Sequence, residues 1–349
     1  MKNSQSWPAK SGRVTIKDIA NYTGYSIATV SRVLNNSGVF YSEETSRKIK
    51  KAVKELNYQP DAIARGLKIK KTFNIAFIEP WNSEFFSEIF LGIQEAANEN
   101  GYSVAIFSSN YDKEQENKNI NTILSNRLDG IIMASAVLDK NNIDRLSSHN
   151  IPLVLIEKFV DDKKIPSISI KNLEISKKAV DYLISLGHEK IGFMGEPLEV
   201  GKVETRFRGY KKSLEENNIR FDPGLVFVDE RFMGENFGSS FEYINRNIQR
   251  ICNCTALFVT SDKISIALIK ALKKIGVIVP DNISIIGFDG LEVGKYICPG
   301  LTTVVQPKYE MGYQAMQLLI KVINGEAVEN IELKAELAIG ESTAPIAGR

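Results

Sequence analysis

The segment SIATVSRVLNNSGVF, residues 26–40, sets small polar side chains and a single arginine around three aliphatic residues. Val30, Val33 and Leu34 follow the i, i+3, i+4 spacing of a buried helical stripe. The opposite face of the same helix holds Ala28, Ser31, Arg32 and Asn35. Hydroxyl, amide and guanidinium groups at such a face can form hydrogen bonds with a partner molecule.

The charges of the chain are segregated. Residues 1–71 hold 14 Lys and Arg against 5 Asp and Glu, a net charge of +9, whereas residues 72–349 hold 30 against 37, a net charge of −7. A basic head on an acidic body is what binding a polyanion through one end requires, because phosphate neutralisation with counterion release supplies most nonspecific affinity for DNA. A solvated basic surface without a partner is the alternative.

The basic head is predicted to be helical. Apolar spacing predicts a helix over residues 14–21, and Gly24 then supplies a turn that takes a positive φ. Ser26 can cap a second helix that extends to about residue 35, and Ser42 can cap a third over residues 43–57. The segment that Pro60 opens can form only one or two turns of marginal helix alone.

From residue 73 onward, continuous apolar runs alternate with amphipathic stretches. The runs are NIAFI, YSVAIF, GIIMAS, PLVLI, IGFMG, ALFVT and SIIGF. This alternation predicts an α/β fold in which parallel sheets are covered by helices on both faces. Seven strong runs over roughly 275 residues are too many for one compact unit of average size, so two lobes are predicted.

Length and composition, 349 residues with 43% hydrophobic, fit a globular chain with one small and one large domain. No apolar run approaches the roughly 20 residues of a membrane span. Residues 1–10 lack the apolar core of a secretory signal, so we expect the cytoplasm, with association to the nucleoid. Three cysteines are an odd number and indicate reduced thiols. Cys252 and Cys254 have only His149 and His188 to complete a metal site, so we expect neither a metal nor a cofactor.

Catalytic motifs are absent from the sequence. It has no P-loop, no G-x-G-x-x-G after an apolar run, no G-x-S-x-G elbow and no H-E-x-x-H helix. His188 follows Gly187 at a predicted helix end, and we expect it to be structural, because no nucleophile or metal-binding group accompanies it. We therefore do not expect an enzyme.

Open parallel sheets bind ligands beyond the carboxyl ends of their strands. The residues in such positions after four of the apolar runs are Asn82, Phe85, Phe86, Ser135, Ser261, Asp262 and Asp289. Aromatic rings beside a few polar groups suit a small polar ligand, because rings cover apolar faces and carboxylates accept hydroxyl protons. The alternative is that Asp262 only caps its helix and that the two phenylalanines belong to the core.

Two segments, VTIKDIANYTGYSIATVSRVLN and LNYQPDAIARGL, resemble the lactose/galactose repressor (LacI/GalR) family of bacterial transcription regulators. The blocks GHEKIGFMG, RFRGY, IGVIVPDNISIIGFDG and PGLTTVVQP extend the resemblance over residues 14–343. It implies a helix-turn-helix head (residues 1–58), a hinge helix and linker (59–71), and an effector-binding and dimerisation body (72–349). The body would resemble periplasmic sugar-binding proteins, with one lobe over about 72–169 and 304–328 and the other over about 170–303 and 329–345.

The resemblance also implies DNA contacts. Ile27, Ala28 and Arg32 would face base edges, and of the three only Arg32 can read guanine through a pair of hydrogen bonds. Contacts with DNA, mainly close approaches to phosphates, are implied for Thr15, Ser26, Thr29, Ser31 and Asn35. In the hinge, Ala64 and Leu67 would enter the minor groove, with Leu67 as an apolar wedge that kinks the duplex.

In the body, the resemblance implies effector contacts for Phe85, Ser135, Lys171, Lys202, Arg206, Phe232, Ser261 and Asp289. Lys171 stands where the family usually has an aspartate. Ammonium and guanidinium groups pair with carboxylates and phosphates, so Lys171, Lys202 and Arg206 near one cleft would favour an anionic effector, such as a sugar phosphate or a sugar acid.

We therefore predict a sequence-specific, DNA-binding transcription regulator, a repressor rather than an activator, whose operator affinity is controlled by a sugar or sugar derivative. A homodimer would bind a pseudo-palindromic operator, and the effector would shift the population between arrangements of the lobes. A phosphocarrier protein as corepressor, used by one branch of the family, stays open. The alternative is a solute-binding protein of a sugar transporter, which the basic head and the missing export signal disfavour.

Overall fold

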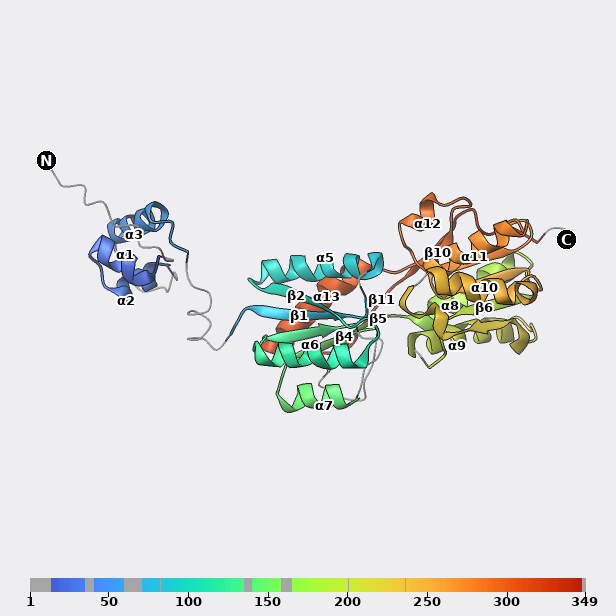
Figure 1. Cartoon of the computed structure of the whole chain (residues 1–349), viewed down its shortest axis with the longest axis horizontal. Coiled ribbons are helices and arrows are strands. Elements are labelled where there is room, and N and C mark those ends of the chain that lie inside the picture. Colours follow the sequence, from blue (N-terminus) through green and yellow to red (C-terminus); the bar gives the residue numbers. More distant parts are fainter. Residues whose placement is uncertain are drawn as a thin grey trace. The chain divides into compact units, whose positions relative to one another are not determined.

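The computed structural model of the protein describes residues 14–34, 41–59, 71–81, 83–134, 140–157, 165–199, 201–235 and 237–346. The chain divides into two compact units, Met1–Thr72 and Phe73–Arg349, which we call the head and the body (Figure 1). In the described parts of the chain, no helix is long and apolar enough to cross a membrane.

The head is helical over its described residues. Its helices are α1 (Ile16–Thr23), α2 (Ile27–Leu34) and α3 (Glu43–Glu55). Gly24 ends α1 with a φ of +73°, and the Ser42 side chain caps α3, as predicted from the sequence. Ile19, Val30 and Ile49, one from each helix, are fully buried against one another. Residues 60–70 of the predicted hinge and linker lie outside the described residues.

The body contains two six-stranded sheets in its described residues. The first has the order β11 (Ile331–Leu333), β5 (Ser167–Ile170), β4 (Leu153–Ile156), β3 (Gly130–Met133), β1 (Asn74–Glu79) and β2 (Ser103–Ser108). The second has the order β12 (Glu336–Ala338), β10 (Thr302–Val305), β9 (Ser284–Asp289), β8 (Ala256–Val259), β6 (Ile191–Gly195) and β7 (Val226–Val228). All pairs are parallel except β10 with β12. The seven predicted runs form β1, β2, β3, β4, β6, β8 and β9, which confirms the α/β class.

Helices cover both faces of each sheet. In the first lobe, α5 (Glu84–Glu99) and α13 (Lys308–Ile323) lie on one face, and α6 (Lys113–Ser125) and α7 (Lys140–Ser148) lie on the other. In the second lobe, α8 (Asn172–Ser185) and α9 (Gly201–Glu216) oppose α10 (Phe237–Ile251) and α11 (Asp262–Lys274). The short α12 (Val293–Tyr296) follows β9, and 3-10 turns span Pro223–Leu225 and Glu230–Glu235.

Two glycines let α5 and α13 cross closely. A Cβ atom at Gly92 would collide with the carbonyl oxygen of Tyr309, and one at Gly312 would collide with that of Ile89. The N-terminal ends of these two helices are therefore held at a fixed distance from each other.

The chain passes between the two sheets three times, after Ile170, Val305 and Leu333. The last crossing corrects the predicted boundary near residue 328, because β11 pairs with β5 of the first sheet. Asn330 strengthens that pairing by accepting hydrogen bonds from the backbone N–H and the hydroxyl of Ser167. The predicted boundary at residue 303 is also early, because β10 stays paired with β9 as far as Val305.

Candidate nucleic-acid interface and ligand pocket

Helix α2 is held in place by its cap and by two buried valines. Ser26 Oγ accepts a hydrogen bond from the Thr29 backbone N–H at 3.1 Å, and the two hydroxyls are 2.9 Å apart. Val30 and Val33 are buried in the head core, as their spacing predicts. Leu34, the third member of the predicted stripe, is only partly buried.

The opposite side of α2 is open to solvent. Ser26, Ile27, Ala28 and Arg32 are exposed, with 47% of Ile27 accessible, whereas Thr29 and Ser31 are half-buried. Thr15, at the start of α1, is exposed but also forms a capping box with Asp18. Three other residues with predicted DNA contacts, Asn35, Ala64 and Leu67, lie outside the described residues. The face thus offers one guanidinium among small groups, which allows a close approach to a nucleic-acid backbone.

A pocket lies between the two lobes of the body. Its walls are formed by Trp81, Phe85, Phe86, Glu196, Lys202, Thr260, Ser261 and Asp289. Phe85, Phe86, Lys202, Ser261 and Asp289 were predicted to lie at a ligand site, and the structure brings these five together from segments far apart in the sequence. The predicted Ser135 lies outside the described residues.

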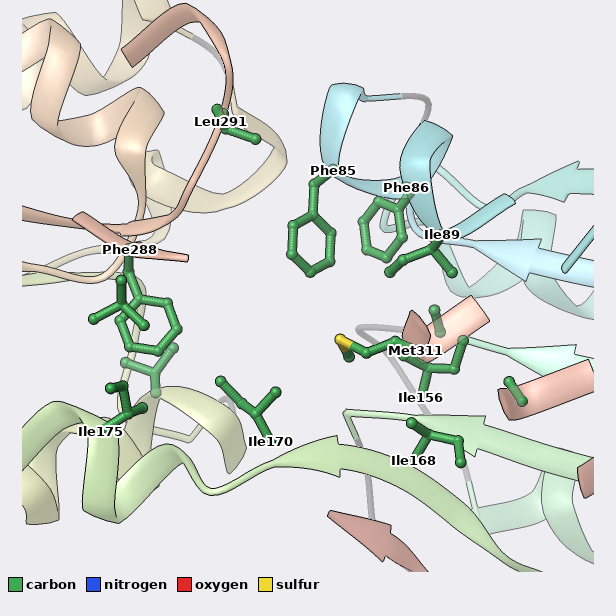
Figure 2. Packing of buried hydrophobic residues seen from close by; sticks show 14 of the residues in the cluster. Phe85, Phe86, Ile89, Ile156, Ile168, Ile170, Ile175, Phe288, Leu291 and Met311 are labelled. Atoms are coloured by element: carbon green, nitrogen blue, oxygen red, sulfur yellow. The ribbon is translucent and has the colours of Figure 1, made fainter. Parts of the chain in front are cut away.

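The first lobe supplies the aromatic wall of the pocket. Ser83 caps α5 by accepting a hydrogen bond from the Phe86 N–H at 3.4 Å, which fixes the first turn. Phe85 and Phe86 project from that turn with ring centroids 5.1 Å apart, opposite Phe288 and Leu291 of the second lobe (Figure 2). Trp81 stands edge-on to Phe86 at 5.2 Å. Such rings can cover the apolar faces of a ligand.

The second lobe supplies the polar groups. Asp289 ends β9, and its Oδ1 accepts a hydrogen bond from Gln306 Nε2 at 2.9 Å. Glu196 Oε2 accepts a hydrogen bond from Thr260 Oγ1 at 2.7 Å. The Lys202 ammonium lies 6.0 Å from the centroid of the Phe85 ring. Two carboxylates and one ammonium at one site can accept and donate hydrogen bonds to a polyhydroxylated ligand.

Three predicted effector contacts, Lys171, Phe232 and Arg206, do not line this pocket. Lys171 is exposed at the start of α8, where its ammonium lies 3.3 Å from Glu174 Oε1. Phe232 is buried in the core on the other side of the second sheet, with its ring centroid 4.9 Å from that of Tyr243. The sequence could not reveal these positions, because both depend on which partner packs beside the residue.

Arg206 lies directly behind the pocket and is 1% exposed. Its Nε donates to Asn172 Oδ1 and its Nη1 to the Thr260 carbonyl, both at 2.9 Å, and the guanidinium lies 3.6 Å from the Phe288 ring centroid. Its Nη2 is 3.8 Å from Glu157 Oε2 and has no hydrogen bond among the described residues. Of the three cations predicted to favour an anion, only Lys202 lines the pocket.

Three pocket residues were not predicted, namely Trp81, Glu196 and Thr260. Glu196 directly follows β6, and Thr260 directly follows β8, so both lie at carboxyl ends of parallel strands. Applied after the run IGFMG, the rule that selected Asp289 would also have selected Glu196. Thr260 was not selected because it is the last residue of the run ALFVT, after which Ser261 and Asp262 were chosen.

Two buried acids near this edge of the sheets have raised pKa values. Burial and the neighbouring Asp289 raise the pKa of Asp262. Asp262 braces the loop after β9 by accepting hydrogen bonds from the Leu291 N–H at 2.7 Å and from Thr303 Oγ1 at 2.5 Å. Burial also raises the pKa of Glu79, the last residue of β1, to about 7.

His188 has the structural role that was predicted for it. Nδ1 lies 3.1 Å from Thr255 Oγ1, and Nε2 lies 3.1 Å from both Ser284 Oγ and the Ala344 carbonyl. Burial lowers the pKa of the imidazole. The ring therefore ties the C-terminal segment to the second sheet.

A helical head with an open, arginine-bearing helix, joined in one chain to a two-lobed body with a pocket between its lobes, defines a class of ligand-responsive DNA-binding proteins. Comparisons with known families agree. Residues 15–61 match the family described as "Bacterial regulatory proteins, lacI family", and residues 180–343 match "Periplasmic binding protein-like domain".

Known relatives cover almost the whole chain. The HTH-type transcriptional regulator RegA of Clostridium saccharobutylicum is 32% identical over 94% of this chain and 99% of its own length. The lac repressor dimer bound to operator and the anti-inducer ONPF has a TM-score of 0.82 at 27% identity, over 95% of this chain and 100% of that chain. A LacI-type regulator from Alkaliphilus metalliredigens, complexed with D-xylulofuranose, has a TM-score of 0.70 at 28% identity, over 77% of this chain and 98% of that chain. This chain belongs to the lacI family of bacterial regulatory proteins; it is a DNA-binding transcription regulator and not an enzyme.

Proposed function

We propose that the protein is a dimeric repressor whose affinity for a pseudo-palindromic operator is controlled by a sugar or sugar derivative bound between the lobes. The observation that carries this proposal is the pocket itself, because Phe85 comes from one lobe and Asp289 from the other. A ligand that contacts both walls binds one arrangement of the lobes more tightly than others, and this difference is what shifts a population.

The effector is proposed to be a sugar or a sugar acid. Glu196 and Asp289 accept hydroxyl protons, and the single ammonium of Lys202 pairs with a hydroxyl or with one carboxylate. Two carboxylates beside one ammonium disfavour a phosphate dianion, so the sugar phosphate allowed by the sequence is the weaker candidate.

On the DNA side, Arg32 is proposed to read one guanine in the major groove, while Ser26, Thr29 and Ser31 approach phosphates. Ile27 and Ala28 would make apolar contacts with base edges, since neither side chain forms hydrogen bonds.

The test has two parts. The full-length protein is first used to select operator sequences from a random duplex library, and the selected duplex is then titrated by fluorescence anisotropy. Monosaccharides, their uronic and aldonic acids and their 6-phosphates are added in turn, together with a phosphocarrier protein in a separate arm. We expect a two-fold symmetric operator and a shift in its Kd of at least about tenfold with one sugar or sugar acid. Selection without two-fold symmetry, or an effect confined to sugar phosphates, would contradict the proposal.

A further inference from the structure

Lys308, the first residue of α13, carries a positive charge that is almost completely buried. Only 2% of its side chain is exposed. The ammonium donates hydrogen bonds to the carbonyl oxygens of Asp289, at 3.0 Å, and Gly290, at 2.9 Å. It also lies 3.4 Å from Glu88 Oε1. A buried ammonium is tolerated only when it is paired and hydrogen-bonded, so these three partners keep Lys308 in place.

The two carbonyl groups belong to a tight turn at the pocket. Asp289 has a φ of +113°, in a region that residues with side chains rarely adopt, and Gly290 has a φ of +67°. A Cβ atom at Gly290 would lie 2.7 Å from Val305 Cα, so the turn has no room to relax in that direction. An unfavourable backbone conformation persists only where its surroundings hold it. Lys308 bonds both carbonyl groups of this turn, and the Asp289 carboxylate that lines the pocket depends on its shape.

The third partner of Lys308, Glu88, lies in the first lobe together with Lys308, whereas the Asp289–Gly290 turn lies in the second lobe. Glu88 lies on α5, and Glu84, one helical turn earlier on the same face, accepts a hydrogen bond from the Glu292 N–H at 2.6 Å. Two carboxylates of α5 thus reach the loop that follows β9, one directly and one through Lys308. The same first turn of α5 carries Phe85 and Phe86. The aromatic wall and the strained turn are therefore connected through one ammonium group.

We propose that Lys308 is a positioning residue that couples the pocket to the approach of the two lobes. Its ammonium, held by Glu88 of the first lobe, keeps the Asp289–Gly290 turn of the second lobe in the shape that presents the Asp289 carboxylate. The inference rests on the proposed function only in the role that it gives to Asp289 as an effector contact.

A purely local role for Lys308 makes a different prediction. If Lys308 served only to begin α13, a change at Glu88, on another helix, would leave the turn after β9 unaffected. If the ammonium transmits the position of α5 to the turn, removing either partner loosens the turn, and removing both does no more than removing Lys308 alone.

Hydrogen–deuterium exchange of the full-length protein tests this without DNA or effector. The variants are Lys308→Met, Glu88→Gln and the double variant, with Lys321→Met as control, because Lys321 is an exposed lysine on the same helix. The peptide that contains residues 289–293 is followed, and the Leu291 amide within it donates to Asp262.

We expect this peptide to exchange about tenfold faster in Lys308→Met and about threefold faster in Glu88→Gln, with the double variant equal to Lys308→Met. Peptides of the head and the Lys321→Met control should exchange like the wild type. Unchanged exchange in Lys308→Met would overturn the proposal. The proposal would also be overturned if Glu88→Gln speeded exchange of this peptide in the Lys308→Met variant as much as it does in the wild type. Because no ligand is used, a failure to find a sugar effector contradicts the proposed function while leaving this result intact.

Discussion

The open face of α2 and the pocket between the lobes are built in opposite ways. On α2, Ser26, Ala28 and Arg32 are exposed, and the packing of the helix depends on Val30 and Val33 on the other side. At the pocket, Asp289 is 6% exposed and is held by Gln306, and the arginine behind it is 1% exposed. Substitutions on the open face of α2 can therefore change binding without changing stability, whereas around the pocket the same side chain contributes to both binding and stability.

The largest expected effect is at Arg206. Replacing it by alanine leaves the Asn172 and Thr260 acceptors and the nearby Glu157 carboxylate without their buried cation. Breaking such an arrangement from one side costs about 3 to 5 kcal/mol of the free energy of unfolding. Urea unfolding of the full chain, followed by circular dichroism, measures it. Arg208→Ala on the same helix, where the side chain is 60% exposed, is the control and should change the free energy by less than about 0.5 kcal/mol. Equal losses of unfolding free energy in the two variants would contradict the structural role given to the buried arginine behind the pocket.

Glu79 gives the pocket region a pH dependence. Burial raises its pKa from 4.5 to about 7, so the folded state binds the proton more tightly than the unfolded state does. Stability contributed by the protonated form is complete below about pH 4.5 and is lost as the pH rises through 7. Glu79→Gln removes this dependence and should stabilise the body by about 3 kcal/mol at pH 8, with little effect at pH 4.5. Urea unfolding at both pH values checks it, and the same gain at both would show that the carboxylate is not responsible.

Arg32 tests the other side of the comparison. Arg32→Ala should weaken binding to the selected operator by about 1 to 3 kcal/mol, relax the preference at one base pair, and leave the unfolding free energy within about 0.5 kcal/mol. Anisotropy titrations on the operator and on its single-base variants measure this. Arg47→Ala removes the same charge from α3, where Arg47 is also exposed, and serves as the matched control. If Arg32→Ala lost the same binding free energy on every duplex, Arg32 would contact phosphates and not a base.

Local signals in the sequence predicted the head better than the pocket. Caps such as Ser42 and the turn at Gly24 depend on neighbouring residues, and both were confirmed. In the body, strong apolar runs were read correctly, but β5, with the sequence SISI, was missed, because alternating serines hide a strand that is buried on both faces. The rule that ligands bind beyond the carboxyl ends of parallel strands selected Asp289, but it did not select the neighbours on which the position of Asp289 depends.

The limits of sequence reasoning at the pocket have one physical cause. Lys171 and Lys202 look alike in the sequence, yet one lies beside Glu174 in solvent and the other lines the pocket. Lys308 was not singled out at all, although its ammonium holds the turn at Asp289. Lys202 meets Phe85, and Lys308 meets Glu88, across more than 100 residues of sequence, and no local pattern records such contacts.

The smallest expected effect is at Ser26, where one residue has a structural and a binding role that can be separated. Its hydroxyl caps α2 by accepting the Thr29 N–H, and loss of such a cap costs about 1 kcal/mol. Ser26→Ala should therefore speed hydrogen exchange of the α2 amides in the full chain. Ser26→Asp keeps a capping oxygen, so exchange should stay near the wild type, but a carboxylate beside phosphates should weaken operator binding. If the loss of operator affinity in both variants only followed their faster hydrogen exchange, Ser26 would affect DNA binding solely by stabilising α2. Binding and stability would then not be separable at the first turn of this helix.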